Sequence, residues 1–139
     1  MDPRDVVRPF YEQCLTVTPG GDPARVATIL GELLAPDFRS VNAAETKSRQ
    51  ALIGQIQFFW KLVPDLRWTI EELLQDGNRV VVRSTATGTP RGEFLGVATD
   101  GTRSFRIMTI DIHTVVGRQI REVFHLEEWT TALQQLRGA

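Results

Sequence analysis

The segment that most constrains the fold of this chain is residues 62–96, which predicts a helix end followed by two long strands. Residues 68–74 form the first predicted strand, and residues 79–87, rich in β-branched side chains, form the second. An Asp-Gly-Asn turn signal separates them. Pro64 disfavours helical geometry at the residue before it, so a helix that arrives from upstream must end there. The segment therefore predicts a helix, a turn and an antiparallel hairpin.

Three helices are predicted before this hairpin. Asp2-Pro3 and Asp22-Pro23 each combine an N-cap residue with proline at the first helical position. The first of these helices ends before Pro19-Gly20-Gly21, and the second ends near Pro36. Residues 48–62 form the third, with apolar side chains on one face. The segment between the second and third helices is predicted to be a connector with a short extended piece.

Shorter signals after the hairpin complete an antiparallel sheet. Residues 92–97 form a short strand or bulged edge, residues 104–115 a long strand, and residues 120–129 the last strand before a tail helix. The long strand carries apolar residues on both faces, and such a strand must be covered on both. The prediction is one α+β domain, residues 1–139, a cone of three N-terminal helices packed on a curved, mostly antiparallel sheet of about five strands. Helices cover one face of the sheet, and we expect a second copy to cover the other, giving a homodimer through the sheet.

Composition excludes several classes of function. Sixteen Lys and Arg residues against seventeen Asp and Glu residues give a net charge of -1, so no overall field attracts nucleic acid or an anionic membrane. No apolar run approaches the ~18 residues of a membrane span, and the N-terminus shows no apolar signal segment. The lone Cys14 has no partner for an internal disulfide, and no zinc-type spacing is present. We expect a cytoplasmic protein that uses no metal and no cofactor.

Four segments of the chain carry a resemblance to a known family. They are Val63-Pro64-Asp65-Leu66, Gly77-Asn78-Arg79-Val80, Arg83, and Gly88-Thr89-Pro90-Arg91-Gly92-Glu93-Phe94-Leu95-Gly96. Their order and spacing resemble the SnoaL-like polyketide cyclases of the nuclear transport factor 2-like superfamily, and the resemblance continues to the C-terminus. It implies a cone-shaped α+β barrel with an apolar pocket. It also implies acid/base chemistry without a cofactor, such as an intramolecular aldol closure.

The C-terminal segment nominates a catalytic group through the same resemblance. The family's closing motif has a tryptophan followed four residues later by an aspartate; here Phe124 takes the tryptophan position and Glu128 the aspartate position. The resemblance thus implies that Glu128 is the general acid/base. An apolar hollow raises the pKa of a carboxyl group toward the working pH, as this role requires. Alternatively, Glu128 caps the final helix or pairs with an arginine at the surface.

Two differences from the family pattern bear on this assignment. Glutamate is one methylene longer than aspartate, and a small displacement of a catalytic group can cost ~100-fold in rate. Many of the cyclases have a histidine after Gly-Thr in the hairpin, and here that position is Pro90, whose side chain has no hydrogen-bonding group. The activity then needs a replacement from elsewhere in the chain, or it is absent.

Strand alternation assigns the two histidines to faces of the sheet. Phe124, Leu126 and Glu128 share one face of the last strand. If that face lines the hollow, His125 points away and suits an interface or surface role better than catalysis. His113, late in the long strand, faces either the hollow or the opposite surface.

The two arginines on central strands are secondary candidates. Ser84 shares a face with Pro90 and lines the hollow, whereas Arg83 supports the back of the sheet unless a β-bulge reverses the two. Arg106 lies opposite Glu128 in one register, where it lowers the pKa of that carboxyl, and faces away in the other.

The pocket itself is predicted from both parity and resemblance. Phe38 and Trp60 line the pocket in one interpretation and are ordinary core residues in the other. The full predicted pocket set is Phe38, Asn42, Trp60, Ser84, Met108 and Phe124.

Three hypotheses about function follow. The first is a small-molecule protein whose apolar pocket supports aldol cyclisation or isomerisation of a hydrophobic carbonyl compound. The second is a non-catalytic ligand-binding or protein-interaction module of the same fold. A closed apolar hollow that contains no carboxyl with a shifted pKa would support it. The third, ranked lowest, is an epoxide-hydrolase-like activity, which needs an Asp-Arg-Asp set in the pocket.

Overall fold

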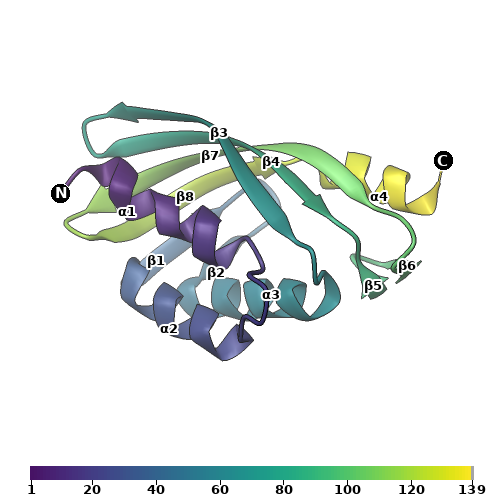
Figure 1. Cartoon of the computed structure of the whole chain (residues 1–139). Helices are drawn as coiled ribbons and strands as arrows, with labels where there is room; N and C mark the ends of the chain where they lie inside the picture. The colour runs from purple at the N-terminus through teal and green to yellow at the C-terminus, as the bar shows by residue number, and fades with distance from the viewer. Residues whose placement is uncertain (139) are drawn as a thin grey trace.

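A computed structural model describes residues 1–138 and shows a curved sheet with its helices gathered mainly on one face (Figure 1). The main sheet has six strands in the order β2-β1-β8-β7-β4-β3, and β5 and β6 form a separate two-stranded sheet. All neighbouring strands are antiparallel except β1 and β8, which are parallel. The predicted α+β cone is confirmed, although the strands and helices are more numerous than expected. The elements are α1 (Pro3–Pro9), η1 (Phe10–Cys14), α2 (Pro23–Leu33), β1 (Leu34–Val41), β2 (Thr46–Ser48), α3 (Arg49–Leu62), β3 (Arg67–Asp76), β4 (Arg79–Gly88), β5 (Arg91–Phe94), β6 (Val97–Asp100), β7 (Phe105–Val116), β8 (Gln119–Glu127) and α4 (Trp129–Arg137).

The first helix differs from the prediction because it changes type part-way. The Asp2 carboxylate accepts a hydrogen bond from the Arg4 amide at 2.9 Å, as the predicted N-cap should. Pro9 ends α1, and the chain continues as a π-helical turn, η1, in which the Leu15 amide donates to the Phe10 carbonyl at 2.9 Å. Such turns often occur at functional positions in helices.

The connector after α2, predicted to contain a short extended piece, contains more strand than expected: β1 and β2. β1 pairs with β2 on one side and with β8 on the other, so residues 34–48 join the sheet between the second and third helices. Pro36, which lacks an amide hydrogen, lies where the β1–β8 register is irregular, between Leu34 and Arg39. The connector places Asn42, directly after β1, next to the last strand.

The long strand β7 alternates strictly between the inner and outer faces of the sheet. Its inner face carries buried polar side chains, Thr109, Asp111 and His113, among buried apolar ones. Its outer face carries the partly exposed Met108 and Ile110. Apolar residues therefore occur on both faces, as predicted, and the polar ones gather on the covered side.

The β5–β6 hairpin is attached to the body of the protein by buried side chains, the aromatic Phe94 together with Val97. Phe94 is fully buried, stacks on Phe105 with ring centroids 5.8 Å apart, and also contacts Phe59 and Trp129. The hairpin makes no strand pairing with the main sheet. Its position thus depends on side-chain packing.

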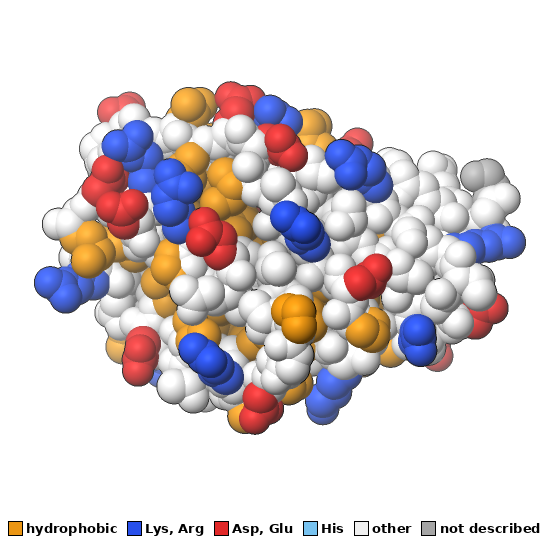
Figure 2. All heavy atoms as spheres, in the orientation of Figure 1, with side chains coloured by type: hydrophobic (Ala, Val, Ile, Leu, Met, Phe, Trp, Pro, Cys, Tyr) orange, Lys and Arg blue, Asp and Glu red, His pale blue; other side chains and the backbone are white. Residues whose placement is uncertain are grey.

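The surface has no dominant sign of charge on the face that Figure 2 shows, where acidic and basic side chains are interspersed. Within residues 1–138, no helix combines the length and apolar character that crossing a bilayer requires.

Candidate active site

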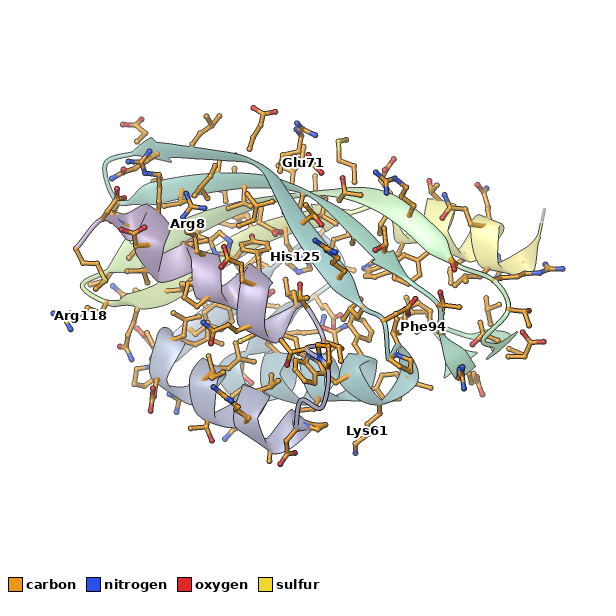
Figure 3. All side chains as sticks on the ribbon, in the orientation of Figure 1. Arg8, Lys61, Glu71, Phe94, Arg118 and His125 are labelled. Carbon is orange, nitrogen blue, oxygen red and sulfur yellow. The ribbon has the colours of Figure 1, made fainter. Side chains whose placement is uncertain are left out.

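A cavity of about 330 Å³ lies between α3 and the inner face of the sheet. Figure 3 shows the labelled His125 in the space between the sheet and the helices. Apolar and aromatic side chains form about half of the lining residues, and the polar ones come from β1, β2 and the segment between them, from α3, and from β7 and β8. The lining residues are Phe10, Leu15, Ser40, Asn42, Glu45, Lys47, Leu52, Gln55, Ile56, Phe59, Trp68, Leu95, Asp111, His113, Val123, His125, Glu127, Trp129 and Leu133.

Asp111 is the carboxyl group most strongly affected by this cavity. It lies on β7 directly opposite His125 in the pairing with β8, and only 5% of its surface is exposed. Burial, together with the negative charge of Glu127, raises the pKa of the Asp111 carboxyl to about 7, although a hydrogen bond from Tyr11 and the positive charge of His125 act to lower it. Near neutral pH this carboxyl can therefore either accept or release a proton.

Tyr11 and His113 support Asp111 from the back of the cavity. The Tyr11 hydroxyl donates to Asp111 Oδ2 at 2.6 Å and lies 2.6 Å from His113 Nε2. Because the hydroxyl has one hydrogen, this arrangement assigns a hydrogen to His113 Nε2, which donates to the Tyr11 oxygen. Burial lowers the pKa of His113 to about 3, so its ring stays neutral. The π turn η1 brings Tyr11 to this position.

His125 and Glu127 form the second polar group. His125 Nδ1 lies 3.4 Å from Glu127 Oε1, and this contact raises the pKa of His125 above its ordinary value. Trp129 Nε1 donates to Glu127 Oε2 at 2.7 Å and fixes the carboxylate. Asn42 Nδ2 lies 3.4 Å from His125 Nε2, and its amide is oriented because Asn42 Oδ1 accepts hydrogen bonds from the Ala44 and Glu45 amides.

The same side chains offer donor atoms of the kind that bind metals. One ligand atom each from Asp111, His125 and Glu127 lie within 4.8 Å of one another. Imidazole and carboxylate ligands suit a divalent ion such as zinc. Each carboxylate already accepts a hydrogen bond from an aromatic side chain, Asp111 from Tyr11 and Glu127 from Trp129. These two carboxylates therefore have hydrogen-bond partners without a metal ion.

Sequence similarity decides the family. The model of the SnoaL-like polyketide cyclases matches residues 6–136. This chain belongs to the SnoaL-like polyketide cyclase family. No sequence among curated proteins matches this SnoaL-like chain.

Solved structures resemble the SnoaL-like chain over nearly its whole length. IdmH from Streptomyces antibioticus, described as a proposed polyketide cyclase, is 26% identical, covers 99% of each chain and superposes with a TM-score of 0.79. A proposed SnoaL-like polyketide cyclase from Jannaschia sp. CCS1 is 19% identical, covers 99% of this chain and 92% of its own, and has a TM-score of 0.83. AclR from Streptomyces galilaeus, described as a proposed hydroxylase, is 20% identical, with coverage of 100% and 98% and a TM-score of 0.75. The last two support the fold alone.

The structure of this SnoaL-like chain corrects the face assigned to the last strand. Val123, His125 and Glu127 line the cavity, whereas Glu128 is exposed and lies outside it. Glu128 Oε1 accepts a hydrogen bond from the Met108 amide at 3.0 Å. The expectation that Glu128 faces a dry hollow is therefore wrong.

Two predicted pocket residues share this error. Phe124 and Met108, expected to shape the hollow, lie on the outer face of the sheet and are 40% and 43% exposed. Phe124 shares its outward face with Glu128, so the same wrong parity displaced both, and Met108 lies on the outward face of β7.

Other predicted pocket residues lie in the core. Phe38 and Trp60 are buried but do not line the cavity, and Trp60 Nε1 donates to the Cys14 carbonyl at 2.7 Å. Ser84 is fully buried on the inner face of β4, also outside the cavity wall, and its hydroxyl has no partner within the described residues.

The five remaining candidates are placed as follows. Arg83 pairs with Glu72 on the outer face at 2.6 Å. Arg106 is exposed, and its backbone amide donates to Gln135. Asn42, His113 and His125 all lie in the cavity wall.

Sequence reasoning missed Tyr11, Asp111 and Glu127. A tyrosine within an apolar helical stripe needs a partner for its hydroxyl when buried. Asp111 and His113, two positions apart in a strongly apolar strand, are the matching signal, because buried polar groups must be paired.

Proposed function

We propose that this protein catalyses proton transfer next to the carbonyl of a hydrophobic small molecule, as an aldol cyclisation or an isomerisation requires. One observation carries the proposal: the Asp111 carboxyl, held by Tyr11 in a mostly apolar cavity, faces the polar pair of Asn42 and His125. A base and a set of hydrogen-bond donors thus meet in one hollow. Membership of the family supports a cyclase-like or isomerase-like role in general terms.

Each side chain has a defined role in the proposed step. The ionised Asp111 takes a proton from the carbon beside the carbonyl, and the electron pair of that C–H bond forms the enolate. Asn42 Nδ2 and protonated His125 donate hydrogen bonds to the carbonyl oxygen as its negative charge develops. Glu127 orients His125 and favours its protonated form. In an isomerisation, Asp111 then returns the proton to carbon. In an aldol closure, the enolate carbon attacks a second carbonyl of the same molecule, the π electron pair of that carbonyl moves to its oxygen, and the resulting alkoxide takes the proton from Asp111.

The cavity wall supports a hydrophobic substrate. Phe10, Phe59, Trp68 and Trp129 contribute aromatic surface, and the polar lining residues come from the neighbouring strands β2, β1, β8 and β7 and the segment between β1 and β2, apart from Gln55 on α3. Pockets of this composition hold apolar ligands and orient them through a small number of hydrogen bonds.

The two alternative functions find less support. A pure binding module does not need a carboxyl whose pKa is raised to about 7, and Asp111 has one. The epoxide-hydrolase-like alternative needs an arginine between two acids, and the cavity lining found within residues 1–138 contains no arginine.

Hydrogen exchange at the α-carbon of tetralone, an aromatic bicyclic ketone, tests the proposed function. In D2O the protein should catalyse the replacement of the α-hydrogens by deuterium, and proton NMR measures the rate from the loss of the α-hydrogen signal. The rate should rise with pH as Asp111 ionises, with a midpoint near its pKa of about 7, and fall once His125 loses its proton. A rate that increases steadily with pH, as hydroxide catalysis does, would contradict the proposal.

Glu128→Gln is the matched control for this measurement. It removes the exposed carboxyl next to the cavity residue Glu127, and we expect the exchange rate and its pH profile to stay unchanged. A large loss of rate in this variant would return the catalytic role to Glu128.

We also propose that a second copy of the chain covers the outer face of the sheet. Met108, Ile110, Phe124 and Leu126 are exposed there, and Leu126 has 72% of its surface accessible. Sheets pack face to face through such apolar rows, and a two-fold dimer brings the same patch together from both copies.

Leu126→Glu should therefore convert the dimer into a monomer. In the proposed interface each copy would bury an introduced carboxylate without a partner, at a cost of several kcal/mol. Sedimentation velocity measures the change, and Phe58→Glu, at an exposed position on α3, is the control. A wild-type protein that sediments as a monomer at tens of micromolar would contradict the proposed interface.

A further inference from the structure

The tip of the β5–β6 hairpin has an unusual residue. Leu95 has a φ of 49°, and it is the one non-glycine residue of the described chain with a positive φ. Gly96, the other residue between the two strands, has a φ of 83°. Two-residue hairpin loops with positive φ at both positions favour Asn, Asp or Gly, because a larger L-residue brings its Cβ close to the following carbonyl oxygen. Leucine is therefore a poor choice for this turn by itself.

The packing of the protein does not explain the leucine either. Phe94 and Val97, on either side of the turn, are 0% and 8% exposed, whereas Leu95 is 38% exposed. Leu95 instead lines the cavity that contains Asp111 and His125. An apolar side chain is thus kept in a disfavoured conformation at the one place where it meets the hollow.

We propose that Leu95 determines ligand specificity by contacting an apolar part of the molecule held in the cavity. The inference rests on the proposed function, because it takes the ligand site to be the Asp111 cavity. The ligand then has two distinct parts: a carbonyl at Asn42 and His125, and a hydrocarbon part against Leu95.

The hairpin is built to hold Leu95 in place. Phe94 anchors the preceding residue in the aromatic core, and β5 and β6 pair through four registered positions. Local strain that persists at one residue of a well-anchored turn is typical of a position selected for binding.

Affinity for prodan, a fluorescent aromatic ketone with an apolar tail, tests this role. In Leu95→Asn the backbone conformation suits the new residue and the apolar contact is lost. We expect the Kd for prodan to rise about tenfold, which corresponds to ~1.4 kcal/mol, while the thermal midpoint stays the same or rises. Leu95→Met keeps an apolar side chain and should bind within about twofold of the wild type.

Leu74→Asn is the matched control. Leu74 is also an exposed leucine, at 56%, and lies on β3 away from the cavity lining, so its substitution should leave prodan affinity unchanged. Unchanged affinity in Leu95→Asn, or no prodan binding by the wild-type protein, would overturn the inference. If Leu95→Asn loses affinity for prodan but the wild-type protein does not catalyse tetralone exchange, the proposed chemistry is overturned and the role of Leu95 in binding stands.

Discussion

Asp111→Asn should abolish most of the tetralone exchange and make the folded protein more stable at alkaline pH. The amide keeps the size of the side chain and an acceptor for Tyr11, but it cannot take a proton. Removal of a general base typically costs 10²–10⁴-fold in rate, so the exchange should fall by roughly that factor.

The gain in stability follows from the direction of the pKa shift. The pKa of Asp111 is raised from 3.8 to about 7 on folding, so its contribution to stability is fully present below pH 4 and is lost as pH rises toward 7. The asparagine variant has no such loss. Three pKa units correspond to ~4 kcal/mol at most, and we expect the variant to be more stable than the wild type by about 2–4 kcal/mol at pH 8.

Urea unfolding of both proteins at pH 4 and pH 8 measures this difference. His113 has a pKa lowered to about 3, and its stabilising effect is lost as pH falls below 6.5, but that effect is common to both proteins and cancels. A stability difference that is the same at both pH values would show that Asp111 is not desolvated in solution.

Phe94→Ala should produce the largest loss of stability. The ring of Phe94 is fully buried and contacts Phe59, Phe105 and Trp129. Truncation leaves a cavity among three aromatic rings that cannot collapse into it, so the free energy of unfolding should fall by about 3–5 kcal/mol. Urea unfolding followed by tryptophan fluorescence measures the loss.

Phe58→Ala is the comparison, because Phe58 is the neighbour of Phe59 on α3 and is 45% exposed. Its truncation should cost less than about 1 kcal/mol. Equal losses in the two variants would mean that the aromatic cluster does not hold the hairpin as the structure shows.

The sequence was most informative where local signals act alone. The N-caps at Asp2 and Asp22, the end of α3 before Pro64 and the turn at Gly77 depend on backbone geometry within a few residues, and all were predicted close to their observed positions. The order of these elements was enough to indicate an α+β cone.

The candidate site was harder to predict because it depends on which face of each strand is covered. In β7 and β8 the outer face carries Met108, Phe124 and Leu126, while the covered face carries Asp111 and His125. The alignment of Phe124 and Glu128 with the family's closing motif therefore selected the wrong side of the last strand. Asp111 and His113 were visible as polar residues in an apolar strand, but their link to His125 depends on the register between β7 and β8, which no local signal gives.

Tyr11 could not be placed for a related reason. Its contacts to Asp111 and His113 join residues about one hundred positions apart, and they depend on the π turn that follows Pro9. A regular α-helix through the same residues would have turned the hydroxyl by a different angle.

The parallel pairing of β1 with β8 also determines when the protein can finish folding. β1 ends before Asn42, yet its partner strand is residues 119–127, so the two can pair only after the intervening residues 42–118 have been synthesised. Contacts between such distant segments form slowly because a long loop must close first. The β3–β4 hairpin can pair early, whereas Asn42 and His125 can meet only once β8 has been made. A nascent chain that stalls before β8 would carry most of the sheet but lack His125 and Glu127, two polar residues of the cavity wall.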